Sequence, residues 1–229
     1  MKTKIKPATN TIHTAAVDAT RSIVAIVLAT VVAGCATTER SRTLGDPVTP
    51  AQAIALQVCS NCHGVDGNAT SPNFPKLAGQ REAYTVSQLN GFKSHNRIDP
   101  AGFEYMWGLS KHLSDAQING LAAYFAAQVP KAGASGVPAV MSEGKQIFEG
   151  GVPAKSIPAC TSCHGEQGQG NGPFPRVAGQ HADYLVKQLL VFQRTDERPE
   201  GAVMKQIAHD LTVKNMQAVA AYLQAVDAK

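Results

Sequence analysis

The stretch Cys59-Ser60-Asn61-Cys62-His63 recurs 101 positions later as Cys160-Thr161-Ser162-Cys163-His164. Both copies are C-x-x-C-H motifs. In this arrangement two thiols can add to the vinyl groups of a haem while the adjoining histidine binds the iron from one face. The two copies therefore predict two covalently bound haem c groups, with His63 and His164 as iron ligands and one-electron transfer as the chemistry.

Zinc sites and thioredoxin-like dithiols also use C-x-x-C, but the surrounding sequence disfavours both. A four-cysteine zinc ribbon places its two pairs about 15–20 residues apart, whereas 97 residues separate Cys62 from Cys160. A thioredoxin-like centre needs a preceding strand and a βαβ pattern, and the flanks here have helical periodicity. The histidine that completes each motif favours haem.

The similarity between the two halves continues past the motifs. Residues 74–80, FPKLAGQ, align with residues 174–180, FPRVAGQ, and the tyrosine, glutamine, leucine and phenylalanine at positions 84, 88, 89 and 92 recur 100 positions later. A repeat of about a hundred residues is too long for a solenoid unit and indicates a duplicated domain.

Two methionines occupy equivalent positions in the repeat. Met106 precedes a leucine by seven residues and a tyrosine by eighteen, and Met204 does the same. A thioether is a soft ligand suited to haem iron. The other reading of a methionine, a filler of the protein core, suits Met141 and Met216, which have no counterpart in the other copy. We therefore expect Met106 and Met204 to be the second axial ligands.

The helix signals predict an all-α fold. Residues 80–93 and 180–193 place apolar and aromatic side chains at helical spacing. Thr49-Pro50-Ala51-Gln52 predicts a helix start leading into the first motif, with the histidine just past the helix end. Ser114 and Gln117 form a capping-box pattern, and Thr212 opens the corresponding helix with a weaker signal. No alternating run of β-branched residues predicts a strand.

From about Pro47 to Val226 the chain resembles the cytochrome c4 family of dihaem cytochromes c. The resemblance is carried by the two C-x-x-C-H motifs, the twin P-K/R-L/V-A-G-Q segments, and, in the first copy, Met106 followed by L-S-D (113–115) and A-A-Y-F (122–125). The resemblance implies two tandem class I cytochrome c domains, each a few helices wrapped around a haem, related by a pseudo-twofold axis. It also implies that the carbonyls of Pro75 and Pro175 accept the free imidazole N–H of each histidine, a bond that orients the ring. Arg97 and Arg198 would contact haem propionates, the alternative being solvated surface arginines.

The N-terminal residues predict export. Basic residues precede an apolar run from Ile23 to Val32 that is too short for a membrane span, so residues 1–34 are expected to be a signal peptide. The run ends at Cys35 in a pattern that resembles a bacterial lipobox, which would explain a fifth cysteine beyond the four that the haems use. Cleavage near Ala33 or Ala36, or a retained anchor, are the alternatives. We expect a periplasmic protein held at a membrane surface by acyl chains on Cys35.

The remaining chain divides into a polar tether (35–46), a first cytochrome domain (47–130), a linker that is flexible by composition (131–138) and a second cytochrome domain (139–229). Without residues 1–34 the chain has 17 Lys and Arg against 16 Asp and Glu. This near balance offers no basic patch for a nucleic acid.

Three functions remain open at this point. The first is a freely docking electron carrier between a quinol-oxidising complex, or a dehydrogenase, and a terminal oxidase. The second is a permanent haem subunit of a dehydrogenase or oxidase. The third is a dihaem peroxidase, which needs an iron with an open position, and the methionine pair argues against it. His112 and His209 are the reserve iron ligands if a methionine assignment fails, and His95 and His181 are isolated.

Overall fold

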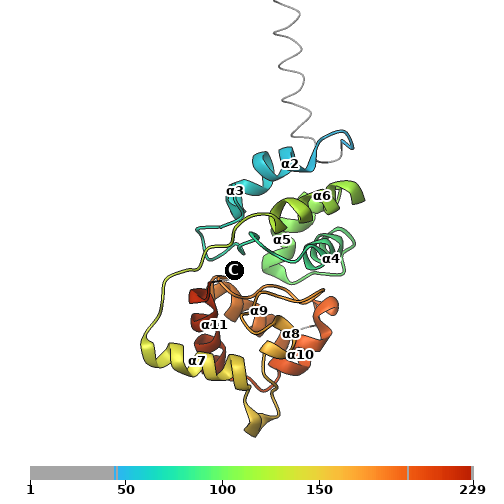
Figure 1. Cartoon of the computed structure of the whole chain (residues 1–229). Helices are drawn as coiled ribbons and strands as arrows, with labels where there is room; N and C mark the ends of the chain where they lie inside the picture. Colours follow the sequence, from blue (N-terminus) through green and yellow to red (C-terminus); the bar gives the residue numbers. More distant parts are fainter. Residues whose placement is uncertain (1–43, 45, 195, 228–229) are drawn as a thin grey trace, which may run out of the picture.

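The computed structural model describes residues 44, 46–194 and 196–227 (Figure 1). The first half contains α2 (Ala51–Ile54), a π-helical segment (Ala55–Cys59), α3 (Ser60–His63), α4 (Glu82–Lys93), α5 (Pro100–Ser110) and α6 (Asp115–Ala126). The second half contains α7 (Pro138–Gly150), α8 (Thr161–His164), α9 (Ala182–Arg194), α10 (Ala202–Ala208) and α11 (Val213–Ala225), with 3-10 turns at Pro153–Lys155 and Pro199–Gly201. These described residues form two isolated β-bridges and no strand, which confirms the all-α class.

Two helical modules lie one above the other in Figure 1, the first made of α2–α6 and the second of α7–α11. Residues 131–137 run between them without a helix. The composition predicts a flexible linker, but its first residues are hydrogen-bonded: the backbone N–H of Lys131 donates to Asn68 Oδ1 (2.9 Å) in the first module, and that of Gly133 donates to the carbonyl of Gln224 (2.7 Å) in the second. The connection is therefore attached to both modules.

The first motif lies inside one continuous helix. The helix starts at Ala51 with Pro50 at its N-cap, one residue later than the sequence predicts. It passes through a π-helical turn and ends at His63, which is the last helical residue and not the residue beyond it. Gly64 follows with a φ of 79°, a conformation that glycine adopts without strain. The chain therefore turns away directly after the histidine.

A small apolar core holds the first module together. Ile54 of α2 packs against Ile118, Leu121 and Phe125 of α6, and all four are buried. The predicted capping box at Ser114 and Gln117 is confirmed. The Gln117 side chain also donates to the carbonyls of Asp46 and Thr49, so the start of α6 fixes the segment that leads into α2.

The second module repeats this plan with a closer helix contact. Phe148 of α7 packs against Val219 and Leu223 of α11. Gly144 allows α7 to approach α11, since a Cβ there would lie 2.0 Å from the carbonyl oxygen of Ala218. The box predicted to be weaker at Thr212 is complete in the structure, with Asn215 as the residue that reaches back. Among the described residues, no helix is both long enough and apolar enough to cross a bilayer.

Candidate haem sites

Each motif histidine is held by a proline carbonyl from the loop that follows it. His63 Nδ1 lies 2.8 Å from the carbonyl oxygen of Pro75, and His164 Nδ1 lies 2.9 Å from that of Pro175. A carbonyl oxygen only accepts hydrogen bonds, so Nδ1 of each ring must carry the proton. The other ring nitrogen, Nε2, is then unprotonated and can donate its lone pair to a metal.

Burial keeps these rings neutral. It lowers the pKa of His63 and of His164, while the bonds to Pro75 and Pro175 act in the opposite direction. An iron ligand must be the neutral imidazole, since a protonated Nε2 has no lone pair to give. The surroundings therefore favour the form that binds metal.

The motif cysteines do not resemble a redox dithiol. Burial raises the pKa of Cys59 to about 11, and it does the same for Cys160. Catalytic dithiols work the opposite way, with a thiol pKa lowered by positive charge or a helix N-terminus. The described residues also hold no cluster of three or more His, Cys, Asp or Glu side chains that could bind a metal ion. These observations fit thiols that are consumed in bonds to a haem.

Met106 lies on α5 and Met204 on α10, so each comes from a helix other than the one that carries its histidine. Both side chains are half-buried. The reserve ligands differ in this respect, because His112 and His209 are exposed to solvent. The positions therefore favour the methionines over the two histidines as second ligands.

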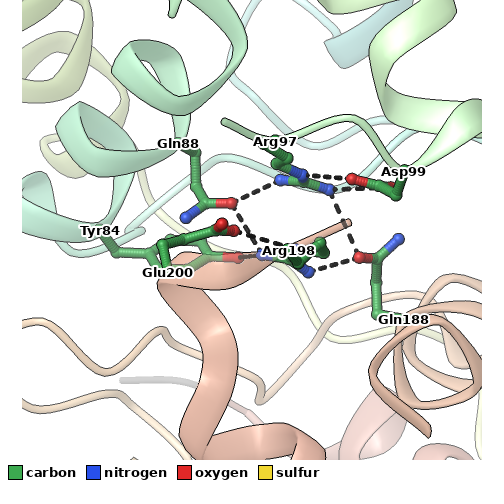
Figure 2. A network of polar contacts seen from close by, with 7 residues as sticks. All are labelled: Tyr84, Gln88, Arg97, Asp99, Gln188, Arg198 and Glu200. Carbon is green, nitrogen blue, oxygen red and sulfur yellow. Dashed lines mark hydrogen bonds and ion pairs between the residues drawn. The ribbon is translucent and has the colours of Figure 1, made fainter. Parts of the chain in front are cut away.

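The two arginines meet in one polar network between the modules (Figure 2). Arg97 forms an ion pair with Asp99, its Nε lying 2.7 Å from a carboxylate oxygen, and also donates to Gln88 and Gln188. Arg198 donates to the same two glutamines and to Tyr84, and pairs with Glu200. Each arginine thus bonds to a glutamine of the opposite module.

Both arginines are buried, with 4% of Arg97 and 5% of Arg198 exposed. The alternative of solvated surface arginines is therefore wrong. Each guanidinium also lies over a phenylalanine of its own module, Phe92 at 4.4 Å and Phe192 at 4.5 Å. The carboxylates of Asp99 and Glu200 accept part of their hydrogen bonds.

A second pair of cations, Lys76 and Arg176, is also buried. The backbone carbonyl of Lys76 accepts a bond from Arg176 (3.0 Å), and Lys76 Nζ donates to the carbonyl of Lys131 (2.8 Å). Arg176 Nε is buried with no hydrogen-bond partner, and burial lowers the pKa of Arg176 to about 10. An unpartnered buried guanidinium nitrogen is costly.

Sequence reasoning missed the glutamines that join the modules. Gln80 and Gln180 end the twin A-G-Q segments. In the structure they precede α4 and α9, which begin two residues later than predicted, and they bond to the backbone of Arg176 and Lys76. The signal was visible as a repeated polar residue within an otherwise apolar and glycine-containing segment. Cys35 lies outside the described residues.

Comparison with known proteins agrees with this arrangement. Residues 48–127 and 141–227 match the family model described as cytochrome c. A cytochrome c-552 of Acidithiobacillus ferridurans is 43% identical over 190 residues, which is 82% of each chain. A cytochrome c4 of Azotobacter vinelandii is 40% identical, over 73% of this chain and 83% of its own.

A crystal structure of reduced cytochrome c4 from Pseudomonas stutzeri superposes with a TM-score of 0.70 at 38% identity, covering 77% of this chain and 96% of its own. A protein of Stutzerimonas stutzeri described as a thiosulfate dehydrogenase electron acceptor is 34% identical, over 76% of this chain and 82% of its own. Both similarities extend over the two modules.

Proposed function

Because this chain belongs to the cytochrome c4 family, and is therefore an electron-transfer protein with two covalent haem c groups, we propose that it carries single electrons in a periplasmic respiratory chain. Its donor would be a quinol-oxidising complex or a dehydrogenase, and its acceptor a terminal oxidase. The haem iron, when bound, supplies reversible one-electron chemistry.

The observation that supports the proposal most is the pair of buried histidines fixed by prolines. The bond from Nδ1 of His63 to the carbonyl of Pro75 fixes the orientation of the imidazole ring. The ring therefore need not reorient when the iron changes its redox state. With Met106 and Met204 as second ligands, each iron would be six-coordinate and closed to substrates. A closed iron suits electron transfer and disfavours a peroxidase.

Polar contacts between the modules support transfer within the molecule. Arg97 and Arg198 share the glutamines of both modules, and Gln80 and Gln180 each bond to the opposite backbone. A buried polar network with most partners in place resists relative motion. We propose that it holds the two haems at a constant separation, so that an electron passes between them without a search of orientations.

The methionine ligands can be tested with three variants of the holoprotein. We expect Met106→Ala and Met204→Ala each to remove about half of the weak near-infrared Met–iron band and to convert one haem to the high-spin state. Met141→Ala is the matched control, since Met141 is also half-buried but has no counterpart in the repeat. A full band in both variants would show that residues other than Met106 and Met204 are the second axial ligands. A high-spin haem in the unaltered protein would favour the peroxidase function.

One observation favours a second candidate, in which the protein is the dedicated acceptor of a dehydrogenase. The relative from Stutzerimonas stutzeri is described in that role for thiosulfate dehydrogenase. A freely docking carrier should purify alone from bacterial membranes, whereas a dedicated subunit should purify with its dehydrogenase at a fixed ratio. Reduction of the purified protein by each type of donor would then separate the two functions.

Attachment to the membrane is a separate part of the proposal. We propose that Cys35 becomes the acylated N-terminus of a periplasmic lipoprotein, because residues 1–34 have the composition of a signal peptide. Mass spectrometry of the mature protein should find acyl chains on Cys35. An unmodified Cys35, or a different first residue, would contradict the anchor and leave the redox proposal intact.

A further inference from the structure

One peptide group in each module is hydrogen-bonded at both ends, once to a motif histidine and once to the other module. The carbonyl of Pro75 accepts from His63 Nδ1 at 2.8 Å. The N–H of the same peptide group, which belongs to Lys76, donates to Gln180 Oε1 at 2.8 Å. Because C=O and N–H lie in one planar, conjugated unit, these two bonds form a continuous chain from His63 to Gln180.

The second module has the same chain in the opposite direction. The carbonyl of Pro175 accepts from His164 Nδ1 at 2.9 Å, and the N–H of Arg176 donates to Gln80 Oε1 at 2.7 Å. The two chains thus relate the modules reciprocally. Each motif histidine is connected through one peptide group to a glutamine of the other module.

The two glutamines are held in place by further bonds. The Nε2 group of Gln180 donates to the carbonyl of Lys76 (3.0 Å), and that of Gln80 to the carbonyl of Arg176 (3.1 Å). Each Oε1 also accepts from the backbone N–H of the next residue in its own chain. Both side chains are buried, with 5% of Gln80 and 3% of Gln180 exposed. They therefore present Oε1 to the opposite peptide in a fixed position.

Such a chain changes the electronic character of the histidine. Hydrogen bonds in series polarise one another, so an acceptor on the peptide N–H makes the peptide C=O a stronger acceptor. A stronger acceptor on Nδ1–H makes the imidazole a more basic ligand. A more basic ligand stabilises ferric over ferrous iron and lowers the reduction potential.

We infer that Gln180 and Gln80 are positioning residues that tune the haem of the opposite module: Gln180 lowers the reduction potential of the haem bound by His63, and Gln80 that of the haem bound by His164. The inference rests on the proposed role of the two histidines as iron ligands. Both glutamines are uncharged, so their effect travels through the hydrogen bonds and adds no net charge near the iron.

The test uses the holoprotein and the variants Gln180→Leu and Gln80→Leu, with each haem followed by its own methyl resonances during a potentiometric titration. Gln180→Leu should raise the potential of the first haem, and Gln80→Leu that of the second. We expect a change of severalfold to about tenfold in the equilibrium constant for reduction, tenfold being about 59 mV for a one-electron couple. In the reduced Gln180→Leu protein the Nδ1 proton of His63 should also move upfield.

The variant His181→Phe is the control for a general weakening of the contacts between the modules. The Nε2 atom of His181 lies 2.8 Å from the carbonyl of Ala69 in the first module, so this variant loses an interface bond that is not part of either chain. It should leave both potentials close to those of the unaltered protein. Unchanged potentials in Gln180→Leu would overturn the inference. So would a Gln180→Leu protein in which both haems shift equally, if His181→Phe shifts them by as much.

A second variant keeps the test decisive if a leucine variant does not fold. Gln180→Glu retains an acceptor for the N–H of Lys76 and strengthens it, so the first haem's potential should fall, and by more than that of the second haem. A shift in the other direction would overturn the inference. Failure of the ligand assignment is separate, because the spectrum of the unaltered protein reports the axial ligands before any titration.

Discussion

Asp99 supplies the carboxylate that neutralises the buried guanidinium of Arg97. It is fully buried, and its carboxylate accepts two bonds from Arg97. Asp99→Asn keeps the shape but leaves the buried guanidinium without its neighbouring charge. Breaking a buried pair from one side typically costs about 3 kcal/mol or more. We expect the free energy of unfolding, measured with urea on the holoprotein, to fall by about that amount.

Glu200 provides the matched control for this prediction. It stands in the same relation to Arg198 as Asp99 does to Arg97, but its side chain is 20% exposed. Water screens this pair more effectively, so Glu200→Gln should cost less than about 1 kcal/mol. If Asp99→Asn cost equally little, another anion would have to neutralise Arg97, as a propionate would.

At the scale of elements, the crossing of α7 and α11 depends on one glycine. A Cβ at Gly144 would meet the Ala218 carbonyl oxygen at 2.0 Å and its carbon at 2.7 Å, and backbone atoms cannot rotate away as a side chain can. Gly144→Ala should therefore force the helices apart and lower the free energy of unfolding by about 1–3 kcal/mol. Thermal or urea unfolding of the holoprotein measures this loss.

Gly150 lies on the same helix and faces open space, with no atom within 4 Å of an added Cβ. Gly150→Ala should be neutral, or stabilising by up to about 1 kcal/mol, because alanine restricts the unfolded chain and favours the helix. Equal destabilisation by both substitutions would show that helix flexibility, and not the crossing, explains the effect at Gly144.

The elements also show where sequence reasoning succeeds. The capping box at Ser114 depends on residues three positions apart, so the local pattern suffices to predict it. The bond from His63 to Pro75 is implied by the resemblance to the cytochrome c4 family and not by spacing alone. The starts of α4 and α9 were predicted two residues too early. The helical spacing of apolar residues did not reveal that Gln80 and Gln180 are drawn into contacts about a hundred residues away.

For the whole molecule, the two modules could be predicted from the repeat, but the way they dock could not. The partners of Arg97 and Arg198 come from both modules, and no spacing rule links a side chain to an acceptor 91 or 110 residues away. These side chains were expected to face propionates or water. Their burial between the modules follows from the pairing of two surfaces, which the sequence of one module does not encode by itself.

Haem is expected to be a structural part of each module. The core of the first module has six buried apolar residues in its main cluster, a small number for a unit of this size. The double variant Cys59→Ala/Cys62→Ala should therefore lose most of the helical circular dichroism of the first module. The corresponding variant of Cys160 and Cys163 should unfold the second module instead. Native-like helical signal without haem would contradict this expectation.

The contact between Gln180 and Lys76 should also make stability depend on redox state. If this contact lowers the potential of the first haem, the thermodynamic cycle requires that oxidation of that haem strengthens the contact by the same free energy. Gln180→Leu should thus destabilise the ferric protein more than the ferrous protein. A tenfold change in the reduction equilibrium corresponds to about 1.4 kcal/mol, which sets the size of the difference.

Urea unfolding of the unaltered protein and of Gln180→Leu in both redox states measures this directly. His181→Phe should lower the stability of the ferric and the ferrous protein equally, because the lost bond to Ala69 is not connected to His63 or His164 through hydrogen bonds of either chain. If Gln180→Leu shifted the potential but lowered the stability of both redox states equally, the cycle would require the same shift of the haem potential in the unfolded chain. The contact with Lys76 would then not be its cause. Unequal losses that match the shift would identify the module interface as part of the redox centre.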